Sequence, residues 1–283
     1  MSHLPCHPGH ALKKCNTLLA WLCLFTLSLA AASAQTPLWI SEVLFNPPGG
    51  ADAPNEYLEL RGPPNAIIPA GTWFLAVEGD AGTNAGTIQN LFDLSGRVLG
   101  GNGFLILLQK GHAYTVSSAA SVLTNGGSGP GWGSGSTSTL RHRGENDQTD
   151  LENAAVTFFL VQTTNTPAIG DDIDADNDGV PDGDLYASWT VLDSIGVLDA
   201  DGVGDFAYGR INCRRKDSPG NTASATHTVI SVGFTASYVA RNGNSTGWAT
   251  NDWVASDILS GVSPNWSLGA ATNTFPEGRA GAA

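Results

Sequence analysis

The sequence predicts an all-β fold of the sandwich or barrel kind, with long loop insertions. Glycine is abundant, at 35 of 283 residues, which is well above the usual ~7%. No segment shows the sustained 3.6-residue periodicity of an amphipathic helix. Short apolar runs recur instead, separated by Gly, Pro, Asn and Asp, and this pattern is typical of strands joined by turns. Several runs have apolar residues on both alternations, as expected of strands covered on both faces.

The first 34 residues have the features of a secretory signal peptide. Lys13 and Lys14 supply the positive charge, residues 18–30 form an apolar run, and small residues at 32–34 predict cleavage after Ala34. The apolar run is too short for a membrane span of ~20 residues. We therefore expect a secreted, extracellular protein without a membrane anchor.

The predicted strands follow the apolar runs. They lie at 38–45, 56–60, 73–77, 103–108, 156–161, 188–197, 205–211 and 228–233. A long insertion is expected at about 109–155. Within it, residues 125–139 are rich in Gly and Ser, which favours a mobile surface loop. The small residues at 276–283 predict a flexible tail.

Charge and cysteine content narrow the possible functions. The formal net charge is −13, which disfavours nucleic acid as a partner because phosphate binding needs Lys and Arg. After signal cleavage Cys213 is the only cysteine, so no internal disulfide is expected and the thiol should be buried. His112, His142 and His227 are far apart and form no metal-binding pair, so we expect them at the surface or at strand ends.

The densest run of carboxylates lies at 170–184. Like charges at this density repel one another, so a bound cation would favour a compact conformation. The aspartates fall at positions 1, 3, 5 and 9 of a calcium-binding loop, and Gly179 at position 6 permits the sharp turn. We predict a calcium site whose ligands are Asp174, Asp176, Asp178, the Val180 carbonyl and Asp182.

Alternatives remain open around this loop. Leu185 stands at position 12, where an EF-hand requires Glu, so the loop more closely resembles the DxDxDGxxD elements of thrombospondin type 3 repeats. A solvated acidic linker is the alternative interpretation, and Asp172 and Asp184 are possible additional ligands. A second acidic turn at 199–205 is interpreted first as an Asp-Gly hairpin turn, and otherwise as a source of ligands for the same ion or a second one.

Several short segments carry a family resemblance. Residues 40–43 (ISEV), 46–47 (NP) and 55–60 (NEYLEL) follow one another near the start of the chain. This series is similar to the opening of the lamin-tail domain, an immunoglobulin-like β-sandwich common in secreted bacterial proteins. Segments that look like its later parts lie at 70–75, 92–94, 99–104, 193–196, 251–254 and 263–265. The resemblance implies that residues 35–275 form an immunoglobulin-like β-sandwich with long loop insertions.

No catalytic site is predicted. The chain has no GxSxG nucleophile motif. Glu56 and Glu59 are three positions apart in a predicted strand, so they should point to opposite faces and not act as an acid/base pair.

Together these features predict a secreted, non-enzymatic, calcium-binding protein. Its role would be adhesion, scaffolding or accessory function, with an unidentified extracellular protein or polysaccharide as partner. Lamin-tail domains often accompany extracellular nucleases, so a part in nucleic-acid degradation is the alternative, although a catalytic domain of roughly 250 residues would not fit beside the predicted sandwich. A third hypothesis is carbohydrate binding by a tryptophan-bearing sandwich, and its candidates are Trp132, Trp248, Trp253 and Trp266. Tryptophans of this kind are more often anchors of the core or of loops.

Overall fold

The computed structural model describes residues 1, 36–48, 52–222, 227–257, 267–269 and 279–281. Apart from Met1, the predicted signal peptide at 1–34 lies outside the described residues. All the elements below belong to the part of the chain that starts at Thr36. Within the described residues, no helix is long and apolar enough to cross a membrane.

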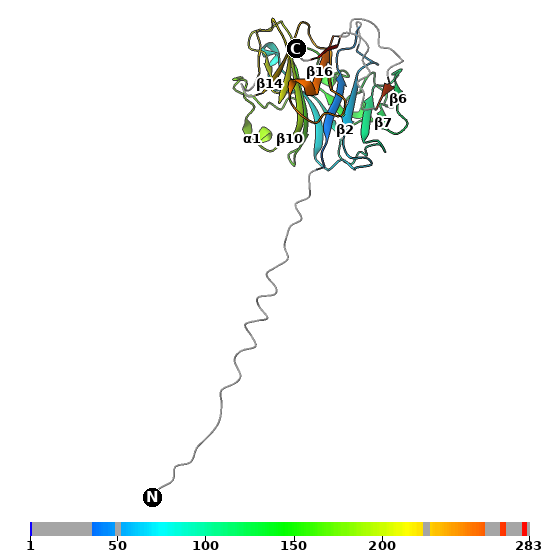
Figure 1. Ribbon diagram of the computed structural model, residues 1–283. Helices are drawn as coiled ribbons and strands as arrows, with labels where there is room; N and C mark the ends of the chain where they lie inside the picture. The colour runs from blue at the N-terminus through cyan, green and yellow to red at the C-terminus, as the bar shows by residue number, and fades with distance from the viewer. Residues whose placement is uncertain (2–35, 49–51, 223–226, 258–266, 270–278, 282–283) are drawn as a thin grey trace. The chain divides into compact units, whose positions relative to one another are not determined.

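The first of two large sheets has seven strands (Figure 1). In spatial order they are β18 (Arg279–Gly281), β16 (Trp253–Ser256), β15 (Tyr238–Arg241), β1 (Trp39–Leu44), β2 (Tyr57–Arg61), β5 (Phe104–Leu108) and β7 (Ser121–Thr124). Neighbouring strands are antiparallel except for β5 and β7, which run parallel. Strand β18 lies within the predicted flexible tail at 276–283 and pairs with β16.

The second sheet also has seven strands. In spatial order they are β14 (Thr228–Val232), β12 (Ile211–Arg215), β10 (Thr190–Leu198), β9 (Val156–Gln162), β3 (Thr72–Glu78), β4 (Ile88–Asp93) and β8 (His142–Gly144). Strands β14, β12 and β10 are mutually parallel, whereas the other neighbours are antiparallel.

The remaining elements are short. Two further parallel pairs join β11 (Phe206–Ala207) to β13 (Asn221–Thr222) and β6 (Thr115–Val116) to β17 (Ser267–Leu268). The described helices are α1 (Gly183–Ala187) and the 3-10 turns η1 (Ala81–Thr83), η2 (Gly135–Thr137), η3 (Glu145–Asp147) and η4 (Thr250–Asp252).

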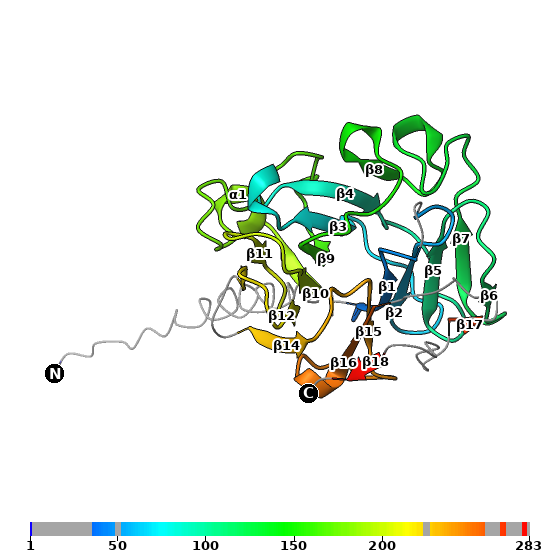
Figure 2. The same cartoon turned by 90° about the horizontal axis from the view of Figure 1, so that it is seen from above.

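The predicted immunoglobulin-like β-sandwich is wrong. Between β10 and β14 the chain winds as stacked coils: Ile195 pairs in parallel with Ile211, and Ile211 pairs in parallel with Thr228. Figure 2 shows β10, β12 and β14 side by side. An immunoglobulin sandwich consists of antiparallel strands with Greek-key connections, whereas parallel stacking of successive coils is the arrangement of a β-solenoid. Of the residues that the structure describes, 37% lie in strands and 7% in helices, and the coils stack in a β-solenoid-like way.

The coils stack because apolar side chains repeat at the same place in successive turns. Val197 is in register with Cys213, and Cys213 is in register with Ile230. All three side chains are buried, so each covers apolar surface of the next. The prediction for Cys213 is confirmed, since its thiol is free and buried.

A glycine allows two coils to approach closely. A Cβ on Gly209 would lie 2.3 Å from the backbone nitrogen of Gly196 on β10. The chain changes direction here, between β11 and β12. Residues 205–211 are therefore not the single strand that their composition predicts, and this reversal is what sets β12 parallel to β10.

Both large sheets contribute to one buried core. Its largest members are the rings and branched side chains of Phe45, Phe74, Phe92, Trp132, Phe158, Trp253, Ile40, Ile195 and Ile211.

The expectation of a surface loop at 125–139 is wrong at its centre. Trp132 is fully buried, and its indole Nε1 donates a hydrogen bond to Glu56 Oε2 at 2.6 Å. His142 is the first residue of β8, which agrees with the expected strand end, but its ring is buried beside Phe92, with 4.5 Å between ring centroids. The insertion at about 109–155 therefore supplies part of the core.

Candidate metal sites

The predicted calcium loop connects β9 to β10 and lies against the hairpin formed by β3 and β4. Ile88 N donates to the Asp171 carbonyl at 2.8 Å, and Ile173 N donates to the Gly86 carbonyl at 3.0 Å. The Ile173 side chain is fully buried. The loop is therefore held to the hairpin immediately before it turns at Asp174.

Asp174 is the centre of the turn. Its Oδ1 accepts from Asp178 N at 3.1 Å, and its Oδ2 accepts from Gly179 N at 2.9 Å and from the Tyr208 hydroxyl at 2.8 Å. Asn177 and Gly179 have left-handed backbone conformations, with φ of 53° and 84°. Burial raises the pKa of the Asp174 carboxyl, and the hydrogen bonds from Tyr208, Gly179 and Asp178 oppose that rise.

The structure brings together three of the five predicted ligands. Carboxylate oxygens of Asp174, Asp176 and Asp178 all lie within 4.8 Å of one another. Two oxygens that are each about 2.4 Å from one calcium ion are at most about 4.8 Å apart, so one ion fits this spacing. Asp174 is buried, whereas Asp176 and Asp178 are exposed to water.

The other predicted ligands have different positions. Asp182 does not belong to the group of close carboxylates, and its N–H donates to the Ile173 carbonyl at 2.6 Å. Val180 takes part in the turn through its N–H, which donates to Asp178 Oδ1 at 2.8 Å. Of the possible additional ligands, Asp172 accepts hydrogen bonds from Asp174 N and Asn84 Nδ2, and Asp184 lies in the first turn of α1.

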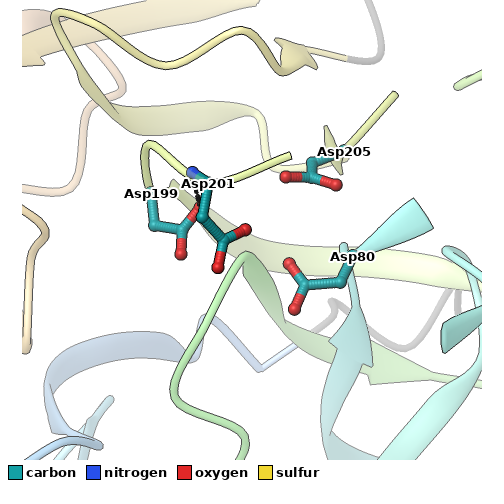
Figure 3. Close-up of side chains that lie close together, drawn as sticks. All are labelled: Asp80, Asp199, Asp201 and Asp205. Carbon is teal, nitrogen blue, oxygen red and sulfur yellow. Dashed lines mark hydrogen bonds between the residues drawn. The ribbon is translucent and has the colours of Figure 1, made fainter. Parts of the chain in front are cut away.

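A second group of carboxylates forms around the acidic turn at 199–205. Oxygens of Asp80, Asp199, Asp201 and Asp205 lie within 4.8 Å of one another (Figure 3). Three of these residues come from the connection between β10 and β11, whereas Asp80 follows β3. The sequence gives no signal for Asp80 as a member, because 124 positions separate its neighbour Ala81 from Asp205.

The second group is largely buried. Asp205 is 3% exposed and Asp199 is 9% exposed, whereas Asp201 is exposed. Asp205 Oδ1 accepts from Ala81 N at 3.1 Å, and Asp199 Oδ1 accepts from Asp201 N at 3.1 Å. Asp205 Oδ2 is buried and has no hydrogen-bond partner among the described residues.

The crowding of carboxylates changes their acidity. Burial, followed by the charges of Glu78, Asp205 and Asp199, raises the pKa of Asp80 to about 7. Burial also raises the pKa of Asp199, which the charge of Arg215 partly opposes. That guanidinium forms its own ion pair, with Asp217 at 2.7 Å.

The tryptophans proposed for carbohydrate binding do not form an open aromatic surface in the part of the chain that the structure describes. Trp132 and Trp253 are buried. The ring of Trp248 is covered by the Arg210 guanidinium, 3.5 Å from its centroid. Trp266 lies outside the described residues.

Comparison with known proteins finds no matching family model, no matching curated protein and no matching solved structure. The resemblance to lamin-tail domains therefore stays a prediction.

Proposed function

We propose that this is a secreted, calcium-binding β protein that serves outside the cell as an adhesion, scaffolding or accessory module and not as an enzyme. The observation that carries the proposal is the turn around Asp174, which gathers the carboxylates of Asp174, Asp176 and Asp178. The partner would be an extracellular protein or a polysaccharide.

The chemistry of the turn favours calcium over transition metals. Its close ligands are all carboxylate oxygens, and neither His nor Cys belongs to the group. Hard oxygen ligands suit calcium, whereas zinc and copper sites favour nitrogen and sulfur. The exposure of Asp176 and Asp178 leaves room for water to complete the six to eight ligands that calcium takes. We expect an affinity of roughly 10⁻⁴ to 10⁻³ M, the range of extracellular modules.

The role of the ion would be to fasten the fold. The loop is bound by backbone to Gly86 and Ile88 of the hairpin and by side chain to Tyr208 beyond β11. An ion shared by Asp174, Asp176 and Asp178 would remove their mutual repulsion and hold these contacts together. Cys213 is buried and free, so a disulfide does not hold these contacts together in the described core.

A role without catalysis is supported by buried acidic groups that are engaged internally. The Glu56 carboxylate accepts hydrogen bonds from Trp132 Nε1, Gln109 Nε2 and Leu151 N. The carboxylate of Asp193 is fully buried against an arginine. Groups held in this way are not free to act on a substrate.

Calcium titration of the purified full chain tests the proposal. Asp176→Asn removes one exposed ligand charge and should weaken binding at the loop at least tenfold. Asp147→Asn is the matched control, because Asp147 is exposed, belongs to neither carboxylate group, and has a φ of 59° that Asn also adopts. If Asp176→Asn binds calcium as tightly as the unmodified protein, the loop is not a calcium site.

A second assay tests the absence of catalysis. Supercoiled plasmid incubated with the protein and either calcium or magnesium should stay intact. If the protein nicks the plasmid in a metal-dependent way and Asp176→Asn abolishes the nicking, the nuclease hypothesis replaces the non-enzymatic role.

A further inference from the structure

We propose that Asp80, Asp199, Asp201 and Asp205 form a second calcium site, separate from the loop at 170–184. The two groups of carboxylates share no residue. This site goes beyond the proposed function, because it depends on other residues and would exist whether or not the loop binds an ion.

A buried oxygen of Asp205 lacks a partner in the described part of the chain. Asp205 is 3% exposed, and its Oδ2 has no hydrogen-bond donor among the described residues. An ionised oxygen buried without a donor strongly destabilises a folded protein, so such atoms are paired or bind a metal. The Asp205 carboxyl group faces the other three, as Figure 3 shows. A cation at this position would be the missing partner.

The spacing of the four side chains fits one calcium ion. One oxygen from each carboxylate lies within 4.8 Å of the others, which is the limit for oxygens that share a calcium ion about 2.4 Å away. Gly202 leaves the space for Asp205, because a Cβ there would lie 2.2 Å from both of its carboxylate oxygens. Asp201 is exposed, so water has access on one side to complete the coordination.

A simple hairpin turn explains neither the buried oxygen nor the spacing. An Asp-Gly turn satisfies its own backbone locally and has no need of Asp80 from another hairpin. Asp80 and Asp205 are nevertheless brought together by backbone contacts: Ala81 N donates to Asp205 Oδ1, and Phe206 N donates to the Gly79 carbonyl at 2.8 Å. The fold therefore holds like charges together, and a divalent cation would compensate them.

The site would join the hairpin of β3 and β4 to the first turn of the stacked coils. Asp80 belongs to the hairpin, and the other three ligands belong to the connection from β10 to β11. The neighbouring Phe206 packs on the other calcium loop, since a Cβ on Gly179 would lie 2.4 Å from its ring. The two ions would thus bind on either side of β11 and fasten it.

The test is a count of bound calcium ions on the full chain in a titration that reaches about 10 mM free calcium, about tenfold above the weakest dissociation constant expected. We expect two ions on the unmodified protein and on the control Asp147→Asn. Asp205→Asn and Asp201→Asn should each lose one ion or bind it at least tenfold more weakly. Asp201 is exposed, so its substitution keeps the test valid if Asp205→Asn does not fold. Asp176→Asn should lose the other ion.

The outcomes separate this site from the loop. If the unmodified protein binds a single ion that Asp176→Asn removes and Asp201→Asn retains, the second site does not exist and the proposed function stands. If the single ion is lost with Asp201→Asn and kept with Asp176→Asn, the second site stands and the loop site fails. Two ions retained in both Asp201→Asn and Asp205→Asn would also overturn the second site.

Discussion

The buried ion pair between Asp193 and Arg241 offers a sharp test of how the two large sheets are joined. Asp193 lies on β10 and Arg241 on β15, so the pair connects one sheet to the other. Their closest atoms are 2.7 Å apart, and both side chains are fully buried. The Asp193 carboxylate also accepts hydrogen bonds from Ile40 N at 2.9 Å and Trp248 Nε1 at 3.0 Å.

We predict that Asp193→Asn lowers the free energy of unfolding by about 3–5 kcal/mol, because it removes the buried carboxylate that pairs with the Arg241 guanidinium. The size follows from the geometry. An amide keeps one acceptor oxygen, but its NH₂ group would face N–H donors where Asp193 Oδ2 now accepts from Arg241 and Ile40. The change therefore removes the charge and also sets donors against one another.

Urea denaturation measures the effect, with the midpoint compared at constant slope. The matched control is Asp217→Asn, which breaks the 2.7 Å pair of Asp217 with Arg215, whose side chains are 63% and 37% exposed. Exposed pairs contribute about 0–1 kcal/mol. A loss at Asp193 no larger than the loss at Asp217 would refute the claim that the buried pair joins the sheets.

Two further predictions concern His142 and Gly179. His142 Nδ1 bonds to the Gly133 carbonyl and its Nε2 accepts from Asn90 Nδ2, so the fold requires a neutral ring, and burial lowers its pKa from 6.5 to about 4. A lowered pKa contributes stability that is complete above pH 6.5 and lost as the pH falls through 4, and urea titrations should show a loss of about 3 kcal/mol. His142→Gln should abolish this pH-dependent loss. If the variant has the same pH profile as the unmodified protein, the burial of His142 does not control it. Gly179→Ala should destabilise the fold by about 1–3 kcal/mol more than Gly170→Ala. Both glycines have left-handed φ values, of 84° and 81°, but only a Cβ at position 179 meets a neighbouring ring. Equal losses of stability in the two variants would contradict the prediction.

The local elements could be predicted from sequence because each depends on contiguous residues. Apart from 205–211, every predicted strand matches an observed strand to within two residues at each end. The run VTFFLV at 156–161 has apolar residues on both alternations and becomes β9, at the centre of the second sheet. Burial on both faces is sufficient to explain such a pattern.

The arrangement of the strands could not be predicted in the same way. Parallel stacking of β10, β12 and β14 depends on a reversal near Gly209, and composition does not distinguish this reversal from a continuous strand. Residues 125–139 look polar and flexible, yet their single Trp132 reaches Glu56 in the core. A long-range hydrogen bond of this kind leaves no periodic trace in the sequence.

The two carboxylate groups show the same contrast. Asp174, Asp176 and Asp178 are close in sequence, so their spacing predicts their proximity, and the structure places them together. Asp182, four positions further on, is not among them, and its N–H donates to the Ile173 carbonyl. Asp80 joins the second group through the pairing of β3 with β9 and the hydrogen bond from Phe206 N to the Gly79 carbonyl, which bring a distant residue beside the turn.

The most direct test of the account is the thermal midpoint of the full chain in millimolar calcium and in EDTA. With a dissociation constant of roughly 10⁻⁴ to 10⁻³ M, each bound ion adds on the order of 1 kcal/mol. This corresponds to about 2–4 °C per site for a domain of this size. We predict a calcium-dependent rise of about 4–8 °C that disappears in the double variant Asp176→Asn, Asp201→Asn. Identical midpoints in calcium and in EDTA would contradict the claim that calcium fastens this fold.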